Sequence, residues 1–208
     1  MRNWRASLPP DAPNHFLVNV LPDQVDGVRA ALKAVTGTDT TLYPMVRGRI
    51  VAVNGEPFDT TRFDTRARRL AEREFNLSWA SDLPKTNRVT AGKWFGAAKG
   101  SDAGLSMEAG IAESLHFKLG DTLTWDLAGA KVTAKITSLR KVEWDSFRPN
   151  FFALFAPGVL EEMPRTYLGA VRAPEGQGSW LSALVQQYPN LLVIDVGEIL
   201  RQIQTIIE

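Results

Sequence analysis

The sequence contains no cysteine in 208 residues and only two histidines, His15 and His116. The absence of cysteine excludes disulfide bonds, thiol catalysis and thiolate metal sites. The scarcity of histidine leaves few ordinary bases for neutral pH, and we expect surface or capping roles for both rings. The motifs G-x-S-x-G and H-E-x-x-H, the P-loop and G-x-G-x-x-G are also missing. The sequence therefore contains no recognisable reaction centre.

Long apolar runs and an excess of one charge are missing as well. No run of about 18 apolar residues is present, and the N-terminus lacks the apolar segment of a signal peptide. The net charge is +1, and the tightest basic cluster, at 65–74, also carries acidic residues. Such a stretch is typical of a solvated helix rather than of a nucleic-acid-binding surface. Taken alone, the residues predict a cytosolic protein that binds no nucleic acid.

Apolar residues are plentiful, at 44% of the chain, and are sufficient for a substantial core. A β-rich run at 15–22 precedes a helical pattern that Asp23 can cap, and a second β-rich run follows at 41–56. The same order returns at 166–196, with a helix that Ser179 can cap. These patterns predict two strand-helix-strand halves of one α/β lobe, with the middle of the chain inserted between them.

The middle of the chain, 58–148, has a different pattern. A basic helix, an alternating run at 74–80 and a helix that Ser106 can cap are followed by two strands around an Ala128-Gly129 turn. This order predicts a small α+β lobe with mostly antiparallel strands.

Aromatic residues concentrate in this middle lobe and at its exit. Trp94-Phe95 and Phe151-Phe152 are adjacent pairs, and neighbours on a strand point to opposite faces of the sheet. One ring of each pair therefore needs a second surface, which can be the other lobe, a partner or an apolar ligand, although core packing is the simplest use of such rings. The candidate contact residues are Trp94, Phe95, Trp144, Phe147, Phe151 and Phe152.

The stretch that follows the middle lobe is interpreted as the return path to the flanking lobe. Trp144, Phe147 and Phe151 are expected to pack this junction, Pro149 to fix the crossover, and 157–164 to form a short turn of helix. A lipid-facing or partner-facing role for some of these rings is the alternative.

A carboxylate mechanism stays open. Glu143 and Asp145 flank Trp144, and residues two apart on a strand share a face, so the pair could supply an acid and a base. Such residues at a strand end more often cap or turn the chain. No metal site is expected, because the two histidines are far apart and no acidic cluster has ligand spacing.

Two longer motifs carry a family resemblance that covers nearly the whole chain from Trp4. The stretch SMEAGIAESLHFKLGDTLTWDLAGAKVTAKITSLRKV, at 106–142, resembles the extracytoplasmic core domain of MacB/FtsX/LolC-type ABC permeases, where a helix runs through Gly-Asp into a hairpin. The stretch WDSFRPNFFALFAPGVLEEMPRTY, at 144–167, is similar to the YbbP-like branch of these permeases. So are EFNLSWASDLPKTNRV upstream and NLLVIDVGEILRQIQTII downstream.

The resemblance implies an α+β fold in which one subdomain is inserted into another. A discontinuous porter-like subdomain, at 15–57 and 149–198, would hold an inserted Sabre-like α+β subdomain at 58–148. Residues 1–14 would lead from a preceding transmembrane helix, and a helix at 199–208 would lead to the next one. The resemblance therefore replaces the cytosolic expectation with the periplasmic side of the bacterial inner membrane, as part of an integral membrane protein.

The same resemblance implies a function without catalysis. In this family the domain transmits ATP-driven motion across the membrane to extract or export hydrophobic or lipid-like compounds. ATP and magnesium would bind a separate cytoplasmic ATPase of the YbbA/LolD type, with no cofactor in this domain. A TesA-like periplasmic esterase or lysophospholipase is an expected partner. The residues alone leave two alternatives, a stand-alone soluble lipid-binding module and a carboxylate-dependent hydrolase.

Overall fold

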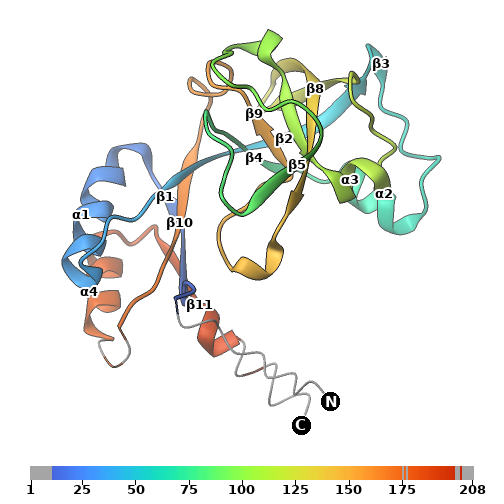
Figure 1. Ribbon diagram of the computed structural model, residues 1–208. Helices are drawn as coiled ribbons and strands as arrows, with labels where there is room; N and C mark the ends of the chain where they lie inside the picture. The colour runs from blue at the N-terminus through green and yellow to red at the C-terminus, as the bar shows by residue number, and fades with distance from the viewer. Residues whose placement is uncertain (1–10, 175, 177, 200–201, 203–208) are drawn as a thin grey trace. The chain divides into compact units, whose positions relative to one another are not determined.

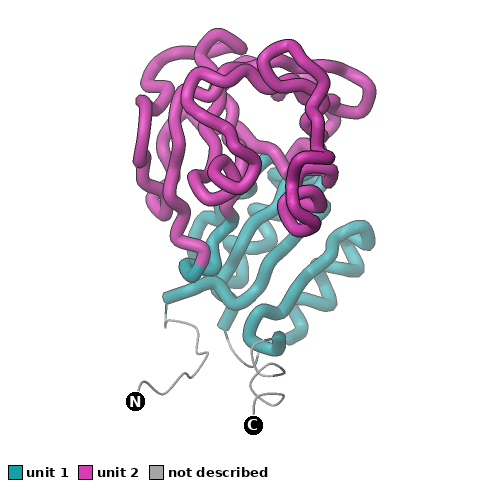
Figure 2. The backbone as a smooth tube through the Cα atoms, turned by 90° about the vertical axis from the view of Figure 1, so that its right-hand side faces the viewer, with its two compact units in different colours: residues 1–44, 145–149, 166–208 teal, residues 45–144, 150–165 magenta. Residues whose placement is uncertain are grey.

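The computed structural model describes residues 11–174, 176, 178–199 and 202, which divide into two compact units (Figure 2). Unit 1 takes the described residues of 1–44, 145–149 and 166–208, and unit 2 takes 45–144 and 150–165. Each unit combines helices with strands, in agreement with the expected α+β class. None of the helices in the described part of the chain is long and apolar enough to cross a membrane.

In unit 1, one strand lies between two others and is antiparallel to both, and two helices lie on one face of these strands (Figure 1). The elements are β1 (His15–Val20), α1 (Val25–Thr36), β10 (Thr166–Val171), α4 (Ser179–Gln187) and β11 (Leu192–Asp195). The central strand is β1, which pairs with β10 and with β11. Strand β1 therefore lies between the two strands of the β10-α4-β11 run.

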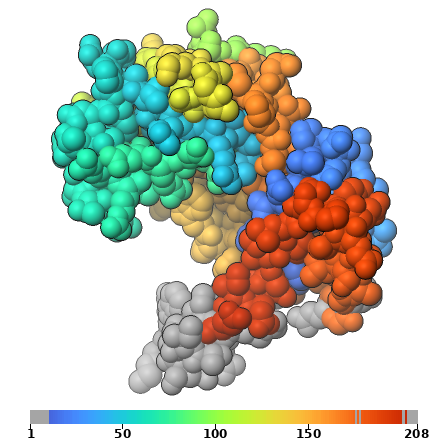
Figure 3. All heavy atoms as spheres, turned by 180° about the vertical axis from the view of Figure 1, so that it is seen from behind, coloured from blue at the N-terminus to red at the C-terminus, as the bar shows by residue number. Residues whose placement is uncertain are grey.

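The core of unit 1 forms where α1 and α4 pack on the strands. Val28 and Leu32 of α1 are buried together with Leu17 and Val20 of β1 and Leu184 of α4. The spacing of four residues places both α1 side chains on the same helix face. Burial of each such side chain contributes roughly 1.5–3 kcal/mol, so packing rather than intrinsic helix propensity holds α1 in place. The space-filling view shows α1 and α4 in contact (Figure 3).

Two helix starts differ from the expected ones. Asp23 lies inside a short 3-10 turn, η1 (Pro22–Gln24), and α1 begins after Gln24 without a side-chain cap. Ser179 is the first residue of α4, and Gly178 occupies the cap position.

At the termini, the predicted linker at 1–14 and helix at 199–208 fall largely outside the described residues, and residues 199 and 202 have helical backbone.

Unit 2 is built mainly from strands, joined by two short α-helices. Its strands are β2 (Tyr43–Val53, from Met45 onward), β3 (Glu56–Pro57), β4 (Phe75–Trp79), β5 (Asn87–Gly92), β6 (Leu105–Glu108), β7 (Thr122–Leu127), β8 (Ala130–Val142) and β9 (Ala153–Phe155). Its helices are α2 (Thr65–Glu72), α3 (Ala109–Ser114) and a 3-10 turn, η2 (Ser101–Ala103). A further 3-10 turn, η3 (Trp144–Ser146), begins at the last residue of the 45–144 segment.

Six strands of unit 2 pair in a closed ring. The pairs are β2–β4, β4–β9, β9–β6, β6–β8, β8–β7 and β7–β2. A sheet whose last strand pairs with its first is a barrel, and side chains fill the interior of a barrel this small. The pairs β4–β9 and β6–β8 are parallel, and the other four are antiparallel. Outside the ring, β5 pairs with β8 and β3 pairs with β2.

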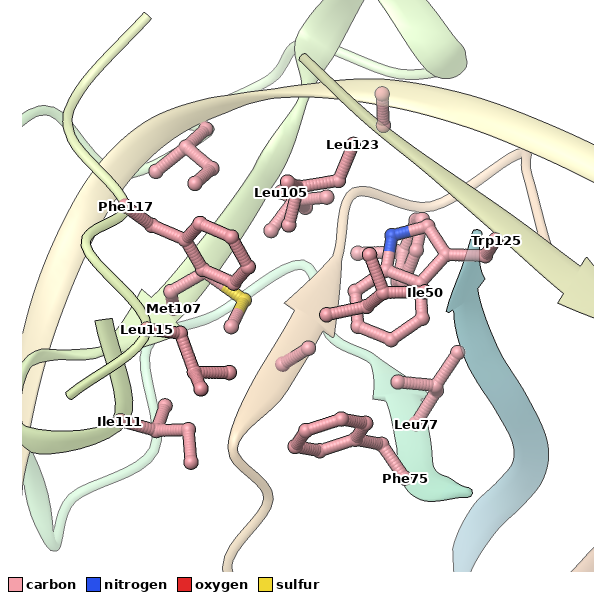
Figure 4. Close-up of a cluster of buried hydrophobic side chains, with 14 of the residues drawn as sticks. Ile50, Phe75, Leu77, Leu105, Met107, Ile111, Leu115, Phe117, Leu123 and Trp125 are labelled. Carbon is pink, nitrogen blue, oxygen red and sulfur yellow. The ribbon is translucent and has the colours of Figure 1, made fainter. Parts of the chain in front are cut away.

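The interior of this ring is the core of unit 2 (Figure 4). Phe75, Trp125 and Phe155 are fully buried. The Trp125 ring meets the Phe75 ring edge-on at a centroid distance of 5.8 Å and the Phe155 ring at 5.9 Å. Such contacts contribute about 0.5–1.5 kcal/mol beyond the burial of area. Leu105 and Met107 of β6 lie two residues apart and face the same interior, as the pleat of a strand requires (Figure 4).

Strand pairing changes two boundaries of the inserted lobe. Most of β2 belongs to unit 2, because it pairs with β4 and β7, whereas 41–56 is expected from sequence in the flanking lobe. The segment 150–165 also belongs to unit 2, because β9 inserts between β4 and β6. Pairing partners distant in sequence, rather than local pattern, decide both assignments.

Two local predictions in this region are wrong. Ser106 does not cap a helix, because it is a buried residue of β6. The cap of α3 is Glu108, whose carboxylate accepts hydrogen bonds from the N–H groups of Gly110 and Ile111. The stretch 157–164 forms turns and no helix. Within it, the carboxylate of Glu161 accepts a hydrogen bond from the backbone N–H of Gly158.

Candidate functional site

The structure brings the aromatic candidates together only as pairs. Trp144 contacts Phe152, and Trp94 contacts Phe95, all four in unit 2. Among the described residues no ring contact joins one pair to the other. The pair that contains Trp144 has the more exposed ring and the larger set of contacts.

The Trp144 cluster consists of Trp144, Phe152, Phe75 and the guanidinium of Arg73. The Trp144 and Phe152 ring centroids are 5.3 Å apart, and Phe152 meets Phe75 edge-on at 6.2 Å. The Arg73 guanidinium lies 5.7 Å from the Phe152 centroid and 5.6 Å from that of Phe75, within the range of a cation–π contact. Phe75 is 0% exposed and Trp144 is 49% exposed, so the cluster runs from the barrel core to the surface.

Different elements place the members of this cluster. Arg73 is the residue that ends α2, and Phe75 is the first residue of β4. Phe152 directly precedes β9, which runs parallel to β4 with Leu77 opposite Ala153. Trp144 begins η3, just beyond the end of β8. An exposed indole supported by packed rings is suited to apolar contact with a partner or ligand.

Arg140 of β8 holds the backbone that carries Phe152. Its side chain is 0% exposed. Nη2 donates to the carbonyl oxygens of Phe151, Phe152 and Ser106 at 3.0, 3.1 and 3.2 Å. Nε donates to the Ser106 hydroxyl at 2.9 Å, and Nη1 donates to the side-chain oxygen of Asn87. All three guanidinium nitrogens therefore have acceptors, which a buried cation requires.

The charge of Arg140 persists in this environment. Burial lowers the pKa of Arg140 to about 10, while the nearby Glu108 carboxylate acts in the opposite direction. The guanidinium therefore stays protonated at neutral pH. The sequence interpretation missed this residue. Ile136, Ser138 and Arg140 are spaced two residues apart in β8 and therefore share its buried face. An arginine at an inward position of an alternating strand is the signal that could have identified it.

The second pair, Trp94 and Phe95, does not follow the strand rule expected for it. Gly92 has φ +74° and ends β5, so the pair lies in the loop beyond the strand. The two rings pack on each other at a centroid distance of 4.4 Å instead of pointing to opposite faces. Phe95 is buried, and the Trp94 indole N–H donates to the Ser81 carbonyl at 2.9 Å. This pair ties two loops together.

The other two candidates stand apart. Phe151 is buried in unit 2, and Phe147 belongs to unit 1, where it is half-buried with φ +58°. A positive φ is uncommon for a bulky residue and marks a tight turn. Packing of Trp144, Phe147 and Phe151 at a junction between lobes stays a prediction.

Two of the three aromatic residues of the cluster, Phe152 and Trp144, should differ sharply in the stability that is lost when each is truncated. Phe152→Ala is expected to lower the free energy of unfolding by about 2–3 kcal/mol, because the ring contacts Phe75 and Arg73 inside the cluster. Trp144→Ala is expected to cost below about 1 kcal/mol, because its ring is half exposed. Urea unfolding followed by circular dichroism measures both. A larger loss for Trp144→Ala would contradict this description of the cluster.

Glu143 and Asp145, the two carboxylates considered for catalysis, are both exposed. His15 contacts the Asp195 carboxylate at 3.6 Å and the Asn14 side-chain oxygen at 2.8 Å. Burial lowers the pKa of His15, and Asp195 opposes that shift. Within the described residues no group of three or more His, Asp or Glu side chains could hold a metal ion.

Comparison with known proteins identifies a relative over nearly the whole chain. No family model matches the sequence. The chain is 37% identical over 200 residues to YbbP, an uncharacterised ABC transporter permease of Escherichia coli (strain K12). The match covers 96% of this chain and 24% of that permease, so the chain spans about a quarter of the length of its relative. The resemblance found in the sequence is thereby confirmed, since the chain is similar over nearly its whole length to a part of an ABC transporter permease.

Proposed function

We propose that the chain is the periplasmic domain of a YbbP-like permease and transmits ATP-driven motion across the inner membrane. The observation that carries this proposal is the 37% identity with an ABC transporter permease over 96% of the chain. In this proposal unit 1 corresponds to the porter-like subdomain and unit 2 to the Sabre-like one. The domain itself is non-catalytic, and a cytoplasmic ATPase of the YbbA/LolD type binds ATP and magnesium.

The strand register of unit 1 supports a domain inserted between two membrane segments. His15, at the start of β1, pairs with Asp195, at the end of β11. The chain therefore enters and leaves this sheet at neighbouring positions, as two adjacent transmembrane helices would require. The transported compounds are hydrophobic or lipid-like, and a TesA-like esterase or lysophospholipase is the proposed periplasmic partner.

Removal of the domain from the full-length permease tests the mechanical role. The permease and its ATPase would be reconstituted in vesicles, with residues 15–198 intact or replaced by a short flexible linker. ATP hydrolysis is expected to continue in the shortened protein, while ATP-dependent extraction of a fluorescent lysophospholipid is lost. Extraction at the unchanged rate without the domain would overturn the proposal.

The exposed ring of Trp144 favours a second role, contact with an apolar ligand. Trp144 is 49% exposed and rests on Phe152, so a bound acyl chain would change its fluorescence. The isolated chain would be titrated with long-chain acyl compounds, beside Trp144→Phe and Trp94→Phe. Saturable quenching that disappears only in Trp144→Phe would support a lipid-binding module, and a flat titration would exclude it.

A further inference from the structure

His15 lies where three other elements of unit 1 meet the start of β1. It pairs with Val171 of β10 on one side and with Asp195 of β11 on the other. Its ring meets the Trp180 ring of α4 edge-on at a centroid distance of 5.5 Å. The side chain is only 14% exposed, so the ring is largely withdrawn from water. The contacts of its two nitrogens therefore decide what the ring can do here.

The neighbouring Asn14 fixes the position of one ring hydrogen. The Asn14 side-chain nitrogen donates to the Ala173 carbonyl at 2.9 Å, and its side-chain oxygen accepts the Ala173 N–H at 2.9 Å. A flipped amide would place donor against donor and acceptor against acceptor. The Asn14 oxygen is thus an acceptor, and it lies 2.8 Å from Nδ1 of His15. Nδ1 therefore carries a hydrogen in both protonation states of the ring.

The other ring nitrogen, Nε2, faces the carboxylate of Asp195 at 3.6 Å. In the neutral ring Nε2 has only a lone pair, because the single hydrogen is on Nδ1. It then has nothing to donate to the carboxylate. A proton added at Nε2 converts the same approach into a charge-assisted contact between imidazolium and carboxylate. One proton therefore decides whether His15 and Asp195 are joined.

Asp195 also holds the start of the helical residues that follow β11 (Figure 1). Residues 196–199 have helical backbone, and Oδ1 of Asp195 accepts the N–H of Glu198 at 2.9 Å. This is the contact of an N-cap residue with the third helical position. The N–H of Val196 donates to the Asn14 carbonyl at 2.9 Å. The residues before β1 and those after β11 are thus joined through the backbone, and Oδ2 of the cap residue faces His15.

The geometry points to a proton-operated clasp, in which His15 of β1 binds the cap residue Asp195 only when Nε2 is protonated. With the neutral ring, the carboxylate is held by the helical residues alone. With the charged ring, it is held from β1 as well. The clasp therefore ties the start of the first strand to the start of the last helical segment more firmly in acid than at neutral pH.

Asp195 is the charged group that acts on the ring. The nine described residues of α4 include no titratable side chain. On β10 the titratable residue is Tyr167, which pairs with Val20 at the far end of β1. Arg172, just after β10, donates through Nη1 to the carbonyl of Ala12 at 2.8 Å. The clasp is therefore a pair of groups rather than part of a larger charge network.

Burial sets the direction in which the clasp responds to pH. It lowers the pKa of His15, and the Asp195 carboxylate opposes that shift. The unfolded chain consequently takes up this proton at a higher pH than the folded chain. The stability linked to His15 is thus present above the ordinary histidine pKa of about 6.5 and is lost as the pH falls through the lowered value. At neutral pH the ring is mainly neutral and the clasp is open.

The use of this clasp rests on the proposed function, in which the chain enters β1 from one transmembrane helix and leaves β11 towards another. Motion of the membrane helices would reach unit 1 through these two ends. A contact that ties them together in acid would make the transmitted motion depend on the pH outside the inner membrane. The clasp and its use in transport are open to separate tests.

NMR of the 208-residue chain tests the clasp without transport. Ring nitrogens of labelled His15 would be followed from about pH 8 to about pH 5, a range that includes the ordinary pKa. At high pH the hydrogen is expected on Nδ1. On protonation, the amide signals of residues 196–198 are expected to shift with the same midpoint as the ring. A hydrogen on Nε2 at high pH, or amides that do not follow the ring, would overturn the clasp.

Asp195→Asn removes the charge and keeps a good cap residue. The midpoint of the His15 titration is expected to move to lower pH, because the carboxylate no longer favours the imidazolium. Asp26→Asn, an exposed position of α1, is the matched control and should leave the midpoint unchanged. His116 of unit 2 is the control within each spectrum. An unchanged midpoint in Asp195→Asn would contradict the clasp, and Asp195→Ser replaces this variant if thermal unfolding shows that it does not fold.

The role in transport is decided in the full-length permease with its ATPase. ATP-dependent extraction of a fluorescent lysophospholipid would be measured with the periplasmic face of the vesicles at about pH 8 and about pH 5, which bracket the ordinary histidine pKa. The ratio of the two rates is expected to be closer to one in Asp195→Asn than in the wild type. Equal ratios would remove the regulatory role of the clasp. The proposed function would still stand if extraction is lost when the whole domain is removed.

Discussion

Replacement of Arg140 by methionine is expected to lower the free energy of unfolding by about 3–5 kcal/mol. Methionine keeps the apolar stem of the side chain but provides no hydrogen-bond donor. The carbonyl oxygens of Phe151, Phe152 and Ser106 would lose their Arg140 donor inside the protein, as would the side-chain oxygen of Asn87. Each buried acceptor left without a donor costs about 1–3 kcal/mol. Stability is measured by urea unfolding followed through tryptophan fluorescence.

Arg88→Met supplies the matched control for this substitution. Arg88 lies in β5 next to Asn87, and its side chain is exposed, so the same chemical change is expected to cost less than about 0.5 kcal/mol. A loss below about 1 kcal/mol in Arg140→Met would show that water replaces the guanidinium. The role assigned to Arg140 in holding the Phe152 backbone would then be wrong.

The second large effect is expected at Gly92, where β5 ends. Gly92 has φ +74°, and a Cβ atom there would lie 2.2 Å from the backbone oxygen of Thr137. Gly92→Ala combines left-handed strain with a backbone clash, and we expect a loss of at least about 3 kcal/mol in the free energy of unfolding. The loop with Trp94 follows directly, so Trp94 fluorescence should change as well. Urea unfolding and the emission spectrum measure the two effects.

Gly96→Ala separates the strain from the clash. Gly96 has a similar φ, +60°, but no described atom lies within 4 Å of the Cβ position. This variant is expected to cost only about 1–2 kcal/mol, the price of a left-handed conformation for alanine. Equal losses in Gly92→Ala and Gly96→Ala would show that β8 moves away from the new methyl group without cost.

Local signals predicted much of the fold correctly. The turn at Asn54-Gly55 has φ +52° and +80°, and the turn at Ala128-Gly129 has φ +53° and +93°, as tight hairpin turns require. The α1 helix follows its apolar spacing of three and four residues and ends before Gly37, which has φ +74°. In these places the residues that form the turn or the helix face are neighbours in the sequence, so pattern alone is sufficient.

The barrel could not be predicted in this way. Strand β9 has three residues, too few to show a period, and its partners β4 and β6 lie about 50–75 residues earlier in the chain. Local pattern also assigned Ser106 to a helix cap, whereas pairing of β6 with β8 and β9 buries it. Tertiary pairing decided these positions against the local preference of the residues.

The sequence named aromatic candidates but not their arrangement. The adjacent-ring argument marked one ring of each pair, Trp94-Phe95 and Phe151-Phe152, for a second surface, and a functional contact of these rings stays a prediction. It could not show that Phe152 meets Trp144 and Arg73, because those contacts depend on how α2, β4 and β9 come together. Arg140 shows the opposite case, since the alternation that buries it was visible in the sequence.

The position of β9 in the ring has a consequence for the newly made protein. A ribosome releases β4 and β6 long before it releases residues 153–155, and β9 is the strand that joins them. Until then each of these strands has an unpaired edge, which favours pairing with the wrong chain. The barrel therefore closes only after residues 153–155 have been translated, and contacts this distant in sequence form slowly. The nascent chain therefore needs protection from pairing with other chains until β9 leaves the ribosome.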